Sequence, residues 1–155
     1  MQRPAIIAIV SGAVGGSVAI ALMELFAARA AYPLFVVPFA TSIVLVMGSP
    51  EAAPAQPRAL IGGHLVATLI GLIVVKTAGP GPWTAAFAVG LAIATMHLTR
   101  TFHPPAGIDP LIVVFNDLSW SFLVAPVAAG ACLLAVFAFA WHKVVQHDTW
   151  PARWW

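Results

Sequence analysis

The sequence contains few charged residues and much apolar surface. Asp, Glu, Lys and Arg make up 8% of the 155 residues, and 61% of the residues are hydrophobic, whereas about a quarter of a typical soluble domain is charged. A soluble core of this size could not bury so many apolar side chains, so the composition predicts an integral membrane protein. The seven Lys and Arg are spread singly along the chain, which excludes a nucleic-acid footprint and a polybasic lipid-binding patch.

The scarcity of cysteine and of catalytic motifs narrows the chemistry further. Cys132 is the one cysteine, which excludes an intrachain disulfide and a cysteine-based metal site. The sequence has no GxSxG, no HExxH and no pair of aspartates within an apolar segment, which are patterns of hydrolases and metalloenzymes. His97, His103 and Asp109 are possible metal ligands, but their spacing across a proline break matches no known ligand pattern. We therefore expect no enzyme activity, no metal and no cofactor.

What the sequence does contain is a series of apolar segments. About 20 apolar residues are needed to cross a bilayer as a helix. The segments predict one all-α transmembrane domain, 1–155, with about five helices. The expected spans are residues 5–28, 34–48, 59–76, 83–99 and 118–142. The second is the shortest, because about 14 residues of helix reach only about 21 Å; it is either a tilted helix or one part of a discontinuous span.

Small residues recur at helical spacing in these segments. Gly12 with Gly16 forms one such pair, and Ala86, Gly90 and Ala94 form a second series. Small residues four apart let another helix approach closely within a membrane. Five short spans can barely enclose a pathway, so we expect these faces to support a homo-oligomer.

The most unusual stretch is TRTFHPPAGIDP, from Thr99 to Pro110. Its three prolines cannot donate backbone hydrogen bonds, and each disfavours the helical conformation in the preceding residue. Irregular backbone at membrane depth is tolerated only where protein buries it or where it lines a watery cavity. Residues 100–117 are therefore predicted to form a loop or a re-entrant segment at a candidate pathway.

A second polar region lies in the loop GSPEAAPAQPR, which ends at Arg58, and in the helix expected after it. His64 lies just inside that helix, behind Gly62 and Gly63, whose lack of a side chain leaves room around the imidazole. With five spans, Arg58 and Arg100 lie on one side of the membrane and Arg153 lies on the other.

These two regions together predict a cationic cluster that donates hydrogen bonds. The expected residues are Arg58, His64, Thr99, Arg100 and His103, with Asp109 tuning the charge. Such a site suits a small inorganic anion, and a histidine that titrates near neutrality could carry a proton with it. For Asp109 two interpretations stay open: a partner of Arg100 or His103, or an N-cap for the short helix after it.

At this point the sequence resembles a known family. QPRALIGGHLVATLIG, beginning at Gln56, and LAIATMHLTRTFHPPAG, ending at Gly107, resemble the two signature regions of the HPP family of integral membrane proteins. The resemblance implies a small multi-span transporter, and plastid and cyanobacterial relatives linked to nitrite imply nitrite as the substrate. The matching motif positions are Gln56, Pro57, Arg58, Gly62, Gly63, His64, His103, Pro104, Pro105 and Gly107.

The chain also departs from the family pattern. It has PFATS at residues 38–42 where PFGAS is usual, and Gly107-Ile108-Asp109 where the family continues as GATA. An aspartate beside the motif repels an anion unless it is paired or protonated. We predict a small-anion transporter or channel, best matched to nitrite, in a bacterial inner membrane. The alternative is a structural or assembly subunit of a membrane complex, which would not need the cationic cluster.

Overall fold

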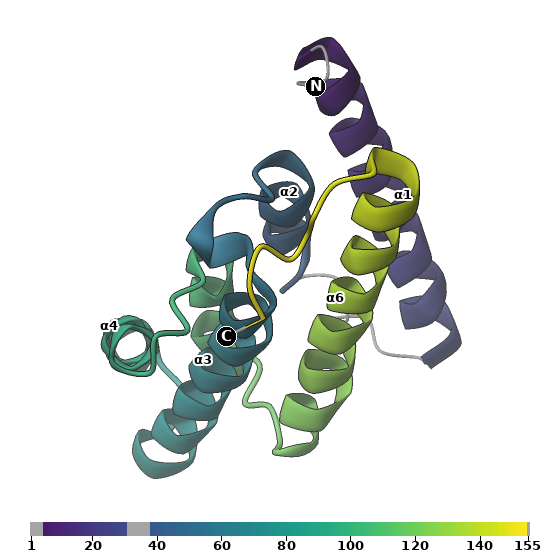
Figure 1. Cartoon of the computed structure of the whole chain (residues 1–155). Helices are drawn as coiled ribbons and strands as arrows, with labels where there is room; N and C mark the ends of the chain where they lie inside the picture. The colour runs from purple at the N-terminus through teal and green to yellow at the C-terminus, as the bar shows by residue number, and fades with distance from the viewer. Residues whose placement is uncertain (1–4, 31–37, 155) are drawn as a thin grey trace.

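The computed structural model describes residues 5–30 and 38–154, and every regular element in them is helical (Figure 1). This confirms the all-helical class. In chain order the elements are α1 (Ala5–Ala30), α2 (Ala40–Gly48), η1 (Ala53–Ala55), α3 (Pro57–Ala78), α4 (Pro82–Leu98), η2 (Pro104–Ile108), α5 (Asp109–Phe115), η3 (Leu123–Ala128), α6 (Ala129–Trp141) and η4 (His142–Gln146).

Three helical stretches are long and apolar enough to cross a membrane. They are Ile6–Arg29, Pro57–Ala78 and Leu123–Gln146, and two shorter apolar helices cover Pro82–Leu98 and Pro104–Phe115. The predicted second span, 34–48, contains the nine-residue α2, while its residues 34–37 lie outside the described part of the chain. Five crossings therefore stay a prediction.

Proline and glycine explain several helix boundaries. α3 and α4 begin with Pro57 and Pro82, because the first turn of a helix needs no hydrogen bond from its N–H groups. α3 ends before Gly79, whose φ of 76° is readily adopted only by glycine. The chain has a kink at Pro126, since Ala125 before it has non-helical φ and ψ values of −135° and 118°,.

The segment after α4 packs directly on a glycine-lined face of α3. A Cβ added to Gly62 would lie 2.5 Å from Thr101 Cγ2, and a Cβ on Gly63 would lie 2.5 Å from His103 Cβ. Further along α3, a Cβ on Gly71 would lie 2.9 Å from Pro110 Cα. We had expected Gly62 and Gly63 to leave room for the His64 imidazole. Instead, their missing side chains leave room for the segment that follows α4.

These contacts define the course of residues 101–117. Thr101 lies beside the first turns of α3 at Gly62, and Asp117 Oδ1 lies 2.8 Å from Nζ of Lys76 in its last turns. The segment thus follows α3 from one end to the other. The predicted break in the helix is present, and a re-entrant course stays a prediction. The glycines of α3 favour this path, because they let the proline-containing backbone pack along the whole helix.

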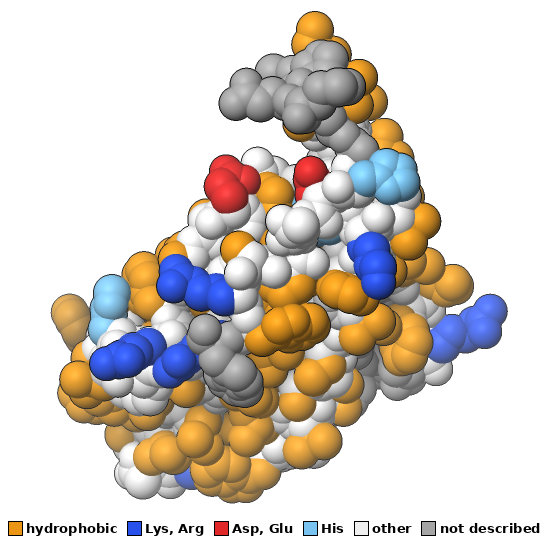
Figure 2. All heavy atoms as spheres, in the orientation of Figure 1, with side chains coloured by type: hydrophobic (Ala, Val, Ile, Leu, Met, Phe, Trp, Pro, Cys, Tyr) orange, Lys and Arg blue, Asp and Glu red, His pale blue; other side chains and the backbone are white. Residues whose placement is uncertain are grey.

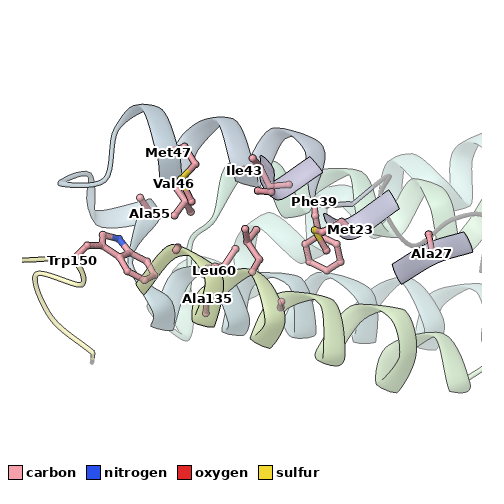
Figure 3. Packing of buried hydrophobic residues seen from close by; sticks show 14 residues of the cluster. Met23, Ala27, Phe39, Ile43, Val46, Met47, Ala55, Leu60, Ala135 and Trp150 are labelled. Atoms are coloured by element: carbon pink, nitrogen blue, oxygen red, sulfur yellow. The ribbon is translucent and has the colours of Figure 1, made fainter. Parts of the chain in front are cut away.

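A second packing unit joins α1, α2 and α6, and Figure 1 shows α1 crossing behind α6. Gly12 and Gly15 of α1 lie against Met47 of α2 and Trp141 of α6, and Gly130 of α6 lies against the Phe39 ring. Figure 3 shows the buried cluster that results, with Trp150 of the C-terminal tail beside Ala55. Part of the predicted small-residue face is therefore used for packing within the chain.

The glycine contact predicts a specific stability difference. Gly63→Ala should lower the free energy of unfolding by about 1–3 kcal/mol, the usual cost of overpacking, because its Cβ would overlap His103. Gly107→Ala is the matched control, since a Cβ there meets nothing within 4 Å. Thermal unfolding of the two purified variants in detergent, followed by tryptophan fluorescence, would measure both. Equal stability of the two variants would contradict the packing described here.

Candidate functional site

The residues predicted to form one site lie in two separate places. His64, His103 and Asp109 are in the interior, each with 0% of its surface exposed. Arg58 and Arg100 instead line a pocket that opens at the surface. The predicted constellation is therefore a buried polar network and a neighbouring cationic pocket, and each has to be described by itself.

Ser42 is the centre of the buried network. Its Oγ lies 2.8 Å from Nε2 of His64 and 2.9 Å from Nε2 of His103. Ser42 comes from α2, His64 from α3, and His103 from the residues just before η2. Three segments that are distant in the sequence thus meet at one fully buried hydroxyl.

Hydrogen bonds extend the network at both ends. Nδ1 of His64 lies 2.8 Å from Oδ2 of Asp109, and the Thr68 hydroxyl donates to the same oxygen at 3.1 Å. At the other end, Nδ1 of His103 donates to the Pro54 carbonyl oxygen at 2.6 Å. Oδ1 of Asp109 is buried and has no hydrogen-bond partner among the described residues. The network therefore runs from Asp109 to the Pro54 carbonyl, with one unsatisfied oxygen at its start.

Local geometry explains why these side chains meet. His64 and Thr68 are four residues apart on α3, so they project from the same helix face. His103 has an extended backbone, with φ −131° and ψ 95°, because the following proline disfavours the helical conformation. These preferences direct the three side chains into the space between α2, α3 and α5.

Neither sequence interpretation of Asp109 is correct. Its carboxylate bonds to His64 and Thr68 rather than to Arg100 or His103. Asp109 is also the first residue of α5, and Ile108 at the N-cap position makes no side-chain cap. Packing of α5 against α3 places the carboxylate opposite His64, a contact between residues 45 positions apart that sequence spacing does not indicate.

The direction of each hydrogen bond follows from which atoms can donate. A carbonyl only accepts, so Nδ1 of His103 carries a hydrogen. His103 has no carboxylate among its hydrogen-bond partners, and a buried unpaired charge is costly, so its Nε2 is an acceptor. Ser42 then donates to His103 and accepts from Nε2–H of His64. The three bonds from His64 through Ser42 and His103 consequently all point toward Pro54.

One proton is left to be shared between His64 and Asp109. With Nε2 of His64 donating to Ser42, Nδ1 of His64 either accepts from a protonated Asp109 or donates to its carboxylate. In both arrangements the two residues together carry no net charge. The interior thus holds a neutral network with a single shared proton at its Asp109 end.

The second place is a pocket of about 320 Å³, lined by Ala53, Gln56, Arg58, Ala59, Arg100 and Arg153. None of the described residues that line it is acidic. Arg58 Nη2 donates to the carbonyl oxygen of Thr99 at 2.9 Å, so Thr99 contributes its backbone here. Figure 2 shows Lys and Arg side chains gathered near the C-terminus marked in Figure 1. The structure thus brings Arg58 together with the Arg100 region.

Arg153 lies on the same side as Arg58, which contradicts our expectation for it. The Gln56 side-chain oxygen accepts from the backbone N–H groups of Ala152 and Arg153, at 2.9 and 3.5 Å. Trp150, only 4% exposed, packs against the His142 ring with centroids 5.6 Å apart. The tail therefore packs near the start of α3. α6 already ends at this end of the molecule, where His142 Nε2 lies 3.2 Å from the Val46 carbonyl oxygen, because residues 101–117 run the length of α3 as a passage that five alternating spans did not include.

The motif residues have distinct structural roles. Gln56 also donates to the carbonyl oxygens of Pro50 and Ala52, at 2.8 and 3.2 Å, and so joins the loop to the C-terminal tail. Pro57 begins α3, and Pro104 and Pro105 begin η2. η1 separates the two parts of the site, because Ala53 lines the pocket while Pro54 accepts from His103.

Four contributors were missed at the sequence level: Ser42, Thr68, the Pro54 carbonyl and Arg153. Ser42 belongs to the PFATS segment and Thr68 follows His64 by one helical turn, so both carried a weak signal. A carbonyl acceptor and a folded-back tail carry none. Among the described residues, no group of three or more His, Cys, Asp or Glu is arranged to hold a metal.

The buried network predicts a large effect of a small change at Ser42. Ser42→Ala would leave both Nε2 atoms without their partner, so it should lower the free energy of unfolding by about 1–3 kcal/mol. Ser17→Ala is the control, because the exposed Ser17 hydroxyl only bonds back to Ala13; there we expect a change within about 0.5 kcal/mol. Thermal unfolding in detergent would compare them, and a tolerant Ser42 would contradict the network.

Comparison with known proteins is consistent with this membrane architecture. The family model described as HPP, transmembrane region, matches residues 1–151. Two transmembrane proteins of Dictyostelium discoideum are 35% and 32% identical to the chain over 125 residues, which is 76% of this chain but 40% and 44% of theirs. The chain thus spans less than half the length of these curated relatives, and no solved structure matches it. On the family match, this chain is an integral membrane protein of the HPP family.

Proposed function

We propose that the chain forms a transport pathway for a small inorganic anion and that the arginine pocket is where the anion binds on entry. The observation that carries this proposal is the convergence of Arg58, Arg100 and Arg153 on one pocket with no acidic residue among its described lining. The family match supports a membrane protein of transporter type. Nitrite is our best single candidate on the family resemblance.

The chemistry of the pocket favours an anion with several oxygen atoms. A guanidinium presents planar N–H donors that match oxyanions, and it stays charged at all relevant pH values. Arg100 and Arg153, which line the same pocket of about 320 Å³, repel one another, and an anion would relieve that repulsion. The N-terminal end of α3 adds further donors, since Arg58 is its second residue,.

The position of Asp109 removes one objection to an anion. A carboxylate next to the arginines would weaken anion binding, but Asp109 is fully buried and bonded to His64. Its charge is therefore compensated by the shared proton rather than by an arginine. The pocket stays electropositive, while the histidines supply a proton site farther inside.

We place this pathway in a bacterial inner membrane and in a homo-oligomer. Ala86, Gly90 and Ala94 of α4 are exposed in the chain, and nothing lies within 4 Å of a Cβ added to Gly90. An exposed small-residue face of this kind supports close contact with a second helix in the membrane.

Uptake into liposomes tests the function. We expect the purified protein to admit nitrite in preference to nitrate, formate and chloride. Arg100→Ala and Arg153→Ala should each lower uptake by roughly tenfold, which corresponds to loss of one charged hydrogen bond. Lys143→Ala is the control, because Lys143 is an exposed cation that does not line the pocket.

Two outcomes would contradict the proposal. No flux of any anion above protein-free liposomes would favour the structural-subunit alternative. We expect Arg58→Ala and His103→Ala each to abolish uptake without preventing membrane insertion. Normal uptake by both variants would contradict the site assignment.

A further inference from the structure

We propose that Asp109, His64, Ser42 and His103 form a proton relay that moves one proton with each anion. This inference rests on the proposed function and specifies how that site is coupled. Hydrogen bonds of 2.8–2.9 Å join these four side chains in series, in the order Asp109, His64, Ser42 and His103. Each of the four residues is 0% exposed, so within the described structure solvent does not reach the four side chains.

The relay step can be written atom by atom. The proton on Asp109 Oδ2 passes to Nδ1 of His64, and the Nε2 proton of His64 passes to Ser42 Oγ. The Ser42 hydroxyl proton passes to Nε2 of His103, and the Nδ1 proton of His103 leaves. One proton has then moved from Asp109 past His103. Asp109 is left as a carboxylate, and both histidines are left in the opposite tautomer. Recovery requires one proton from the opposite side at Asp109 and the return of both histidines and the Ser42 hydroxyl to their starting hydrogen positions, so each completed cycle moves a single proton.

The two ends of the relay have the features that entry and release require. Oδ1 of Asp109 is buried and has no partner among the described residues, although a buried carboxylate oxygen is normally hydrogen-bonded. That orphan oxygen is an acceptor for an incoming proton carrier. At the other end, the Pro54 carbonyl oxygen accepts a hydrogen bond from Nδ1 of His103 but cannot itself be protonated. Release of the His103 proton therefore requires water or the anion to replace the Pro54 carbonyl as the acceptor.

η1 provides the connection between proton release and anion binding. Pro54 is half-buried and lines a groove of about 480 Å³ with Thr41, Leu45, Pro104, Pro105 and Ile108. The neighbouring Ala53 lines the arginine pocket. A small displacement of this three-residue turn would change both places together, so an anion in the pocket can favour release of the His103 proton.

Among the described residues, no further charged side chain forms a hydrogen bond with the network and competes for this proton. α2 contributes Ser42, α3 contributes His64 and Thr68, and η1 contributes the Pro54 carbonyl. His64 and His103, whose ring centroids are 5.1 Å apart, are the titratable groups facing Asp109 and each other. The described ion pair of Lys76 with Asp117 lies at the far end of α3 and is exposed.

A purely structural role explains the network less well. A buried polar network is often no more stable than apolar side chains of the same shape, and one left partly unsatisfied is costly. The orphan Oδ1 therefore lowers stability without a packing benefit. Retaining it is explained if the carboxyl group must exchange its proton.

The experiment measures proton movement and nitrite uptake together. Liposomes that hold a pH-sensitive dye and the purified protein are given a nitrite gradient with the membrane voltage clamped. We expect wild-type protein to admit nitrite together with protons. Asp109→Asn keeps the shape of the side chain but cannot exchange a proton, so it should lower protein-dependent proton movement by roughly tenfold or more. Ser42→Ala should do the same, provided that its unfolding curve shows it to be folded.

Asp117→Asn is the matched control, since it makes the same change at an exposed carboxylate outside the network, and we expect coupled uptake to be unaltered. Wild-type nitrite uptake without protons would overturn the relay and leave the proposed function standing. Absence of nitrite uptake in the wild type would overturn both. Unchanged proton movement in folded Asp109→Asn would overturn the relay alone.

Infrared spectroscopy gives a readout that does not depend on transport. The carboxyl band of Asp109 is identified as the band that is lost in Asp109→Asn and retained in Asp117→Asn. We expect this band to change when nitrite is added to the protein. A band that does not respond to nitrite would overturn the coupling.

Discussion

The close packing of residues 101–113 on the glycines of α3 is the contact on which the rest of the structure depends. A side chain at Gly63 or Gly71 would overlap His103 or Pro110, so the irregular backbone could not lie along this helix. With the glycines present, the segment brings His103 to Ser42 and Asp109 to His64. Backbone that would be costly next to lipid is thereby buried by protein. The same contact holds the fold together and assembles the polar network.

The location of the polar groups follows from the cost of burying charge. Arg58, Arg100 and Arg153 stay at the surface pocket, where water can solvate them. The interior instead holds groups that neutralise one another, because His64 and Asp109 share one proton,. This separation lets one protein keep a cationic surface pocket without placing an uncompensated charge at membrane depth.

Much of the fold was predictable from the sequence, because composition and proline positions act locally. Three features depend on only a few neighbouring residues: the apolar character of the segments, the starts of α3 and α4 at Pro57 and Pro82, and the break at the His-Pro-Pro motif. The pairing of His64 with Asp109 was not predictable, because it depends on how α5 packs on α3. The same holds for Arg153, whose position depends on Gln56, almost a hundred residues earlier in the chain.

The arrangement of the site also explains why the motif residues occur as a set. Gln56, Arg58 and His64 belong to one continuous stretch at the start of α3, yet each serves a different partner: the C-terminal tail, the Thr99 carbonyl and the buried network. His103 joins that network to η1, and η1 borders the arginine pocket. A shift of η1 would therefore change the arginine pocket and the His103 hydrogen bond together. Under the proposed function, this link between the arginine pocket and the proton-bearing interior is the basis on which anion and proton movement would be coupled.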